Sequence, residues 1–353
     1  MENKPTHSTA VSWLPPWSRL APHQIVLIVL WLLTTGSMIV LLWQGVRDTN
    51  QFSIARYLLH AGYAAALLWY FVRSGPPVSQ LPDLRPAAIS RWKYAPWIPV
   101  LVTALMLLMV VISDDGVSLL MLLMIVAAGA IIVIWRREIT MHLVIQGILI
   151  AIIAFFAGLP MMKNGFVNES FGYLFTILAV PIYIAGGLLL GHTRLGGLQL
   201  LANRYLLATR SFLLGCLLFV PLGLANAASG SPAGSDFTWV KAGWMPFLLP
   251  WWSGLIEETW FRLLLVGLVY FLLRPAFPKH PVLAILTAVL FSGITFGLGH
   301  GRTLDTLLTT GLLYGVPFAC IFARRDWEHA VGAHYMVNMI PWVIVFLQNH
   351  VLD

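Results

Sequence analysis

The chain has 353 residues, of which 59% are hydrophobic and only 10% are charged, and its mean hydropathy is +0.83. A soluble protein carries roughly a quarter charged residues, and disordered chains are poor in apolar residues, so both classes are excluded. The net charge of +7 includes no block of about five or more basic residues. This argues against nucleic acid as a partner and for a lipid bilayer, where scattered basic residues set orientation.

Eleven apolar runs approach the length of about 20 residues that a helix needs to cross the hydrocarbon core of a membrane. They lie near 24–46, 54–72, 95–112, 117–135, 139–159, 171–191, 211–228, 246–273, 281–300, 304–322 and 329–350. The runs predict an all-α fold: a polytopic membrane helix bundle of about eleven spans.

The Lys and Arg residues in the loops between these runs are distributed unequally. Only Arg47, Lys163, Lys241 and Arg302 fall on one side, and the other basic loop residues fall on the side of the N-terminus. Basic loops stay in the cytoplasm. We therefore expect a multi-pass protein of a bacterial-type plasma (inner) membrane, with the N-terminus cytoplasmic and the C-terminus outside.

Glu257 and Glu258 are the only acidic residues well inside a predicted span. A charge near the middle of a membrane helix costs ~2.5–3.5 kcal/mol, so such residues face a polar interior or a water-filled cavity. Glu258 and Arg262 are four positions apart and can pair on one helix face, whereas Glu257 points about 100° away. We expect Glu258 to be structural and Glu257 to be free to react.

Two later spans carry three further polar residues, His300, His334 and Asn338. Phe296 and His300 lie four positions apart at the end of the ninth span, and His334 and Asn338 lie four apart near the start of the eleventh. A carboxylate, two imidazoles and a carboxamide are what amide hydrolysis needs: a base for water, a partner that orients it, and donors for the oxyanion.

These segments resemble a known family. EETWFR fits E-E-x-x-x-R, FGLGH fits F-x-x-x-H and HYMVN fits H-x-x-x-N, in that order. Together they are similar to the signature of the CAAX-processing and bacteriocin-processing (CPBP) intramembrane proteases, also called type II CAAX prenyl endopeptidases. The resemblance covers roughly residues 245–350. We therefore divide the chain into 1–245, a transmembrane region of unknown role with about seven spans, and 246–353, a protease core with about four.

The resemblance also implies roles for individual residues. Glu257 would be the general base and would act with His300 on the attacking water, while His334 and Asn338 would donate to the oxyanion. The remaining motif positions would support them: Glu258, Arg262 and Phe296. The implied activity is that of an intramembrane glutamic endopeptidase acting on a peptide or membrane-protein substrate. In the family such substrates are C-terminal prenylated peptides in eukaryotes and leader peptides or membrane proteins in bacteria, and nothing in 1–245 chooses among them.

The family implies neither a metal nor another cofactor, and the sequence agrees in lacking H-E-x-x-H. A metal-dependent version stays open, because histidine and glutamate are also zinc ligands. Cys216 and Cys320 lie in apolar segments about a hundred positions apart and predict neither a disulfide framework nor a zinc knuckle.

Two further alternatives are a proton-coupled membrane transporter and a catalytically inactive scaffold or regulator. Glu and His residues inside spans also mark proton paths, although a transporter is expected to show repeated halves and paired broken helices, and no such repeat is visible. The sequence gives no information on oligomeric state.

The span count creates a conflict of depth. It places His300 at the outer end of its helix and His334 about two turns, roughly 9 Å, from the inner end of its own. Joint action requires a helix that is tilted, short or broken, which membrane proteins tolerate where the helix lines a cavity. We nevertheless predict that Glu257, Glu258, His300, His334 and Asn338 converge.

Other side chains receive structural interpretations. Glycines repeat every four residues in two neighbouring spans, which favours close helix packing; they are Gly293, Gly297, Gly301, Gly311 and Gly315. His60 and His329 lie near span ends, where an interfacial position is expected. Trp260, between the glutamates and Arg262, either walls the site or faces lipid.

Overall fold

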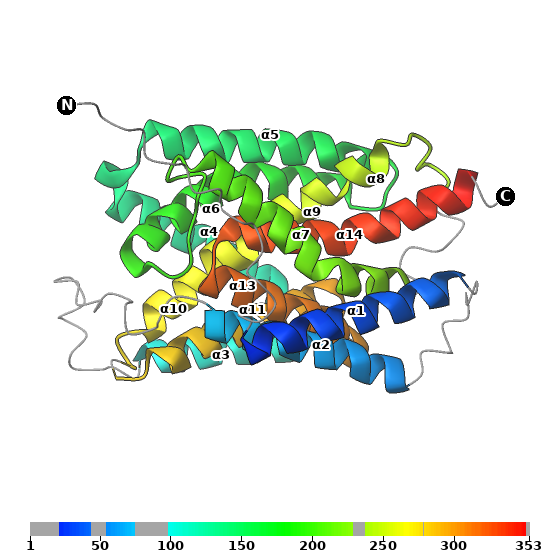
Figure 1. The fold of residues 1–353 in the computed structure, drawn as a ribbon. Helices are drawn as coiled ribbons and strands as arrows, with labels where there is room; N and C mark the ends of the chain where they lie inside the picture. The colour runs from blue at the N-terminus through cyan, green and yellow to red at the C-terminus, as the bar shows by residue number, and fades with distance from the viewer. Residues whose placement is uncertain (1–20, 44–53, 75–97, 229–236, 278, 351–353) are drawn as a thin grey trace, which may run out of the picture.

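The computed structural model describes residues 21–43, 54–74, 98–228, 237–277 and 279–350. Within these ranges the regular structure is entirely helical (Figure 1). The long helices are α1 (Pro22–Trp43), α2 (Ile54–Ser74), α3 (Ile98–Ile112), α4 (Gly116–Ile134), α5 (Met141–Lys163), α6 (Glu169–Thr193), α7 (Tyr205–Ala228), α11 (Pro281–His300) and α14 (Trp327–His350). The 3₁₀ turn η5 (Arg136–Glu138) links α4 to α5.

Two further stretches are divided into shorter helical pieces. The first comprises α8 (Met245–Leu248), α9 (Pro250–Glu257), the π-helix η7 (Glu258–Val266) and α10 (Gly267–Leu273). The second comprises α12 (Leu304–Thr306), the π-helix η8 (Leu307–Gly315) and α13 (Val316–Arg324). Wider π turns are rare and often lie at functional sites.

The helices match the predicted spans in order and number, with small differences at their ends. The largest difference is at α7, which begins at Tyr205 rather than 211. Arg210 lies within the first turns of α7 rather than before them. The helix can include this charged residue because its side chain is exposed. In the part of the chain that the structure describes, eight helices are long and apolar enough to cross a membrane. The protein is therefore a polytopic, multi-pass all-α membrane bundle.

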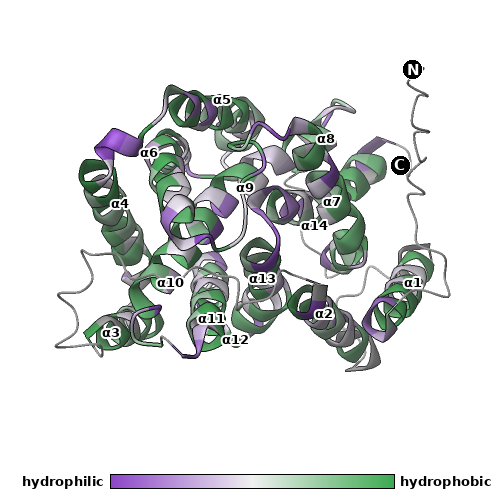
Figure 2. Cartoon of the chain, turned by 60° about the vertical axis from the view of Figure 1, so that its left-hand side comes forward, coloured by the Kyte–Doolittle hydropathy of each residue, from purple (hydrophilic) through white to green (hydrophobic). Residues whose placement is uncertain are grey.

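Burial divides the bundle into a lipid-facing rim and a closed interior. In Figure 2, α1, α3, α4 and α5 lie at the periphery, while α9 and α13 lie inside. The rim helices expose large apolar side chains such as Leu32, Leu122 and Leu149, as expected where the surrounding solvent is lipid. Every residue of η7 and of α13 is buried. Residues from both sides of position 245 share one hydrophobic core.

The glycine repeat brings α11 and the η8 stretch into backbone contact. A Cβ added to Gly297 would lie 2.7 Å from Cα of Gly311, and one added to Gly315 would lie 3.1 Å from Cα of Gly293. The prediction of close packing is thus confirmed for these four positions. Gly301 instead faces the side chain of Thr306.

The first turn of α14 is buried beneath the loop 194–204. The backbone N–H of Trp327 donates to the carbonyl of Gly197 (2.9 Å), and the N–H of Leu200 donates to Oε1 of Glu328 (2.8 Å). The helix therefore starts inside the molecule rather than at its surface, which places His334 farther from that surface than the span count suggested.

Candidate active site

Glu257 is the last residue of α9, and two imidazoles from other helices face its carboxylate. Its Oε2 lies 3.8 Å from Nε2 of His300, the last residue of α11. The same oxygen lies 3.6 Å from Nε2 of His334 in α14. Both separations exceed a direct hydrogen bond and suit groups that share a bound water. The carboxylate and both imidazoles thus meet although their motifs are far apart in the sequence.

Glu258 has different partners from its neighbour. Its Oε2 lies 3.3 Å from Nε of Arg262, and both side chains are fully buried. Its Oε1 lies 2.8 Å from Nδ1 of His334. The pair predicted from the i,i+4 spacing is present, and Glu258 also hydrogen-bonds to one ring nitrogen of His334, which the sequence did not indicate.

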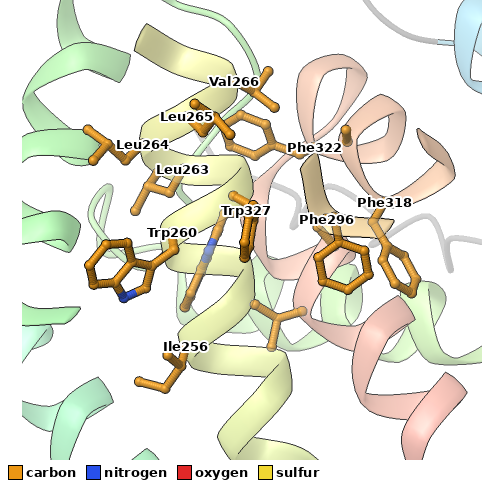
Figure 3. Close-up of a cluster of buried hydrophobic side chains, with 14 of the residues drawn as sticks. Ile256, Trp260, Leu263, Leu264, Leu265, Val266, Phe296, Phe318, Phe322 and Trp327 are labelled. Atoms are coloured by element: carbon orange, nitrogen blue, oxygen red, sulfur yellow. The ribbon is translucent and has the colours of Figure 1, made fainter. Parts of the chain in front are cut away.

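Aromatic rings and a backbone carbonyl complete the surroundings of Arg262. Its NH2 group donates to the carbonyl of Gly315 (3.3 Å), and its Cζ lies 4.3 Å from the centroid of the Phe296 ring. Phe318 stacks on His334 with centroids 4.8 Å apart. Phe296 and Phe318 lie together on one side of η7 (Figure 3). A cation over aromatic faces is stabilised by the ring quadrupole, so the guanidinium has partners although no water reaches it.

The ring of His300 is oriented by its own helix. Its Nδ1 lies 2.9 Å from the carbonyl oxygen of Phe296, which can only accept, so Nδ1 carries a proton and donates. This leaves Nε2 facing Glu257. An imidazole whose outer nitrogen is fixed in this way presents its other nitrogen in a defined direction.

The exposed fraction of the side chains falls across the site from His300 to Glu258. The side chain of His300 is 43% exposed, that of Glu257 12% and that of His334 4%, while Glu258 is fully buried. The site is therefore most open at His300, Oε2 of Glu257 is itself buried, and the Glu258 pair lies behind it in the protein interior.

No family model matches the chain, and no curated protein or solved structure matches it either.

Asn338 lies one helical turn beyond His334 on α14. Its Nδ2 donates to Oγ of Ser253 (2.7 Å), and Ser253 is four residues before Glu257 on α9. Of the five residues predicted to converge, Glu257 lies within 4 Å of both His300 and His334, and Glu258 hydrogen-bonds to His334. Asn338 borders this group through Ser253.

His300 and His334 both lie within 4 Å of the same Glu257 oxygen, so the depth conflict does not keep them apart. Among the described residues, no three His, Cys, Asp or Glu side chains are spaced to hold one metal ion. Cys216 and Cys320 are free and buried.

The sequence prediction missed three contributors to the site: the hydroxyl of Ser253, the ring of Phe318 and the carbonyl of Gly315. Ser253 did leave a signal, because it is a polar residue in an apolar helix and shares a face with Glu257. Phe318 and Gly315 left none, since aromatic residues and glycines are common in membrane helices.

The interpretations of Trp260, His60 and His329 need correction. Trp260 does not face lipid: it is 1% exposed, stacks on Phe175 and lies on the side of η7 opposite to Phe296 (Figure 3). His60 is not interfacial but buried, with Nε2 3.1 Å from Sδ of Met38.

His329 is buried as well and pairs with Asp326, the residue that precedes α14. Its Nδ1 and its backbone N–H lie 2.7 and 2.9 Å from Oδ1 of Asp326, and Ser211 donates to Oδ2 (2.9 Å). Burial acts to raise the pKa of Asp326, but the hydrogen bonds and charge of His329, together with Ser211, outweigh it and hold the pKa below its usual range.

Proposed function

We propose that this protein is an intramembrane endopeptidase that hydrolyses a peptide bond with water activated by Glu257. The observation that carries the proposal is the position of Oε2 of Glu257, 3.8 Å from Nε2 of His300 and 3.6 Å from Nε2 of His334. A carboxylate held between two imidazoles, with a side chain that is 12% exposed inside a membrane bundle, suits a general base.

In the first step Glu257 and His300 hold a water molecule, and Glu257 removes one of its protons. The oxygen then attacks the carbonyl carbon of the peptide, forming a C–O bond and a tetrahedral oxyanion. Collapse of this intermediate breaks the C–N bond, and the proton held by Glu257 passes to the leaving nitrogen. The products are a free carboxylate and a free amine.

His334 and Asn338 stabilise the oxyanion. Ionised by its pair with Arg262, Glu258 only accepts, so Nδ1 of His334 carries the proton between them. Nε2 then donates only when it gains a second proton. Glu257 supplies the proton that it took from water, because its Oε2 is the nearest acidic group to that nitrogen. When the intermediate collapses, the same proton returns to Glu257 and passes from there to the leaving nitrogen. The imidazolium that results is stabilised by Glu258, as in other carboxylate–imidazole pairs of hydrolases.

Arg262 keeps Glu258 ionised at this depth and does not touch the substrate. Its guanidinium is held by the carbonyl of Gly315 and by the Phe296 ring, so the pair is fixed before substrate binds. Preorganised charge of this kind costs no reorganisation during the reaction.

The experiment uses the purified chain in lipid vesicles with two quenched fluorescent peptides, one carrying a C-terminal prenyl group and one resembling a hydrophobic leader peptide. Cleavage of either peptide by the wild type and its loss in Glu257→Gln supports the proposal. Equal cleavage by both chains contradicts it, as does the absence of cleavage with both peptides. Glu257-dependent proton uptake without cleavage would favour the transporter, and no activity of either kind would favour the inactive scaffold.

The protein lies in the plasma membrane with its N-terminus in the cytoplasm. The unequal distribution of Lys and Arg between alternate loops supports this orientation. Alkaline phosphatase fused to the C-terminus, active only outside the cytoplasm, should be active, and a fluorescent protein that folds only in the cytoplasm should be dark there. The opposite pattern would contradict the orientation.

A further inference from the structure

We propose that Ser253 is a positioning residue that sets the orientation of the Asn338 carboxamide toward the reacting carbonyl. The inference rests on the proposed function and adds a residue to its oxyanion site. Ser253 lies outside the motifs by which the site was predicted.

The packing of α9 against α14 places Ser253 there. Ser253 precedes Glu257 by one turn, and Asn338 follows His334 by one turn. Glu257 faces His334 and Ser253 faces Asn338, so the two helices cross antiparallel and the two contacts lie one above the other. The helices are in contact here, since a Cβ added to Gly254 would lie 3.6 Å from the backbone nitrogen of Tyr335, an ordinary van der Waals distance.

Hydrogen-bond chemistry then fixes the amide. The hydroxyl of Ser253 lies 3.3 Å from the carbonyl oxygen of Pro250, which can only accept, so the Ser253 proton points to it. Oγ is left as an acceptor for Asn338, and the group that faces it at 2.7 Å must be the NH₂.

One N–H of Asn338 is thereby used by Ser253, and the second N–H points away from Ser253. Without the hydroxyl the amide could turn and present its oxygen, which would repel an oxyanion. A donor aimed before the reaction starts is what makes an oxyanion site effective.

The test measures kcat and KM for peptide cleavage in vesicles for Ser253→Ala, Ser253→Thr, Asn338→Ala and the double variant Ser253→Ala with Asn338→Ala. Losing a whole oxyanion donor costs about 10²–10³-fold in kcat, so misaiming one should cost about tenfold, with KM changed less than about twofold. Ser253→Thr keeps the hydroxyl and should restore most of the rate. The double variant should be no slower than Asn338→Ala alone, because the two residues act as a unit.

Ser37→Ala is the matched control, because Ser37 also donates to a carbonyl three residues earlier, that of Thr34, in a membrane helix. It should leave kcat unchanged. Ser253→Ala with full kcat, a change confined to KM, or additive losses in the double variant would overturn the inference. If Ser253→Ala does not fold, a slow Ser253→Thr of normal thermal stability overturns it as well. Glu257→Gln separates the two proposals: if it is inactive while Ser253→Ala is fully active, only this inference fails.

Discussion

Nδ1 of His334 lies 2.8 Å from Oε1 of Glu258, across 76 positions of the sequence. The two adjacent glutamates therefore contact opposite nitrogens of the same ring. Glu258 hydrogen-bonds to Nδ1 of His334 and orients the imidazole, and Glu257 faces Nε2. The proposed chemistry needs one carboxylate that fixes the tautomer of an imidazole and a second that takes a proton from water.

Removal of the Arg262 charge should destabilise the bundle strongly. Arg262→Met leaves Glu258 buried without its cation, and an unpaired buried charge costs about 3–5 kcal/mol. Thermal unfolding in detergent micelles measures the effect. Glu258→Gln combined with Arg262→Met should regain part of the loss, because both charges are then absent. A single variant as stable as the wild type would show that the ion pair does not support the fold.

Substitution of Gly297 should separate helices that now touch. A Cβ at this position would lie 2.7 Å from Cα of Gly311, so Gly297→Ala should lower the free energy of unfolding by about 1–3 kcal/mol through overpacking. Gly129→Ala is the control, since nothing lies within 4 Å of its added Cβ, and alanine is the better helix former. Equal unfolding temperatures for the two variants would contradict the close approach.

The low pKa of Asp326 predicts one component of acid sensitivity. Because its folded pKa lies below the unfolded value of about 3.9, the stability that it contributes is fully present above about pH 4. This stability is lost as the pH falls through the folded pKa. The thermal unfolding temperature, measured from pH 7 to pH 2, should therefore fall more steeply at the acid end for the wild type than for Asp326→Asn. Parallel curves would show that His329 and Ser211 do not stabilise the ionised form.

Metal chelation should leave cleavage unchanged. Glu257, His300 and His334 are separated by 3.6 and 3.8 Å at their facing atoms, and the proposed chemistry draws its base from Glu257 alone. Prolonged incubation with 1,10-phenanthroline followed by dialysis should alter kcat by less than about twofold. Loss of activity that added Zn²⁺ restores would instead establish a metal-dependent hydrolase.

The order and place of the helices follow from the sequence because long apolar runs have few alternatives in a bilayer. The pairing of Glu258 with Arg262 was also predictable, since it depends only on spacing along one helix. The contact of His334 with Glu258 could not be predicted, because it depends on how deeply the first turn of α14 is buried beneath the loop 194–204. Spacing along a helix gives no information about its depth, so the span count left His300 and His334 at different levels.

Ser253 shows a second limit. Its hydroxyl could have bonded only to its own backbone, as Ser37 does, and a sequence cannot distinguish a serine of that kind from one that also accepts a bond from another helix. The partner becomes visible only once α9 and α14 are placed side by side.

The most direct test of the account is peptide cleavage in H₂¹⁸O by the wild type, Glu257→Gln and Glu258→Gln in vesicles, with product masses measured. Hydrolysis by water that Glu257 activates predicts one ¹⁸O atom in each new carboxylate for the wild type and a kcat at least about 10²-fold lower for Glu257→Gln, since a general base contributes about 10²–10⁴-fold. Glu258→Gln should keep measurable activity. Full activity in Glu257→Gln with none in Glu258→Gln would contradict this mechanism, because Glu257 would then not be the base.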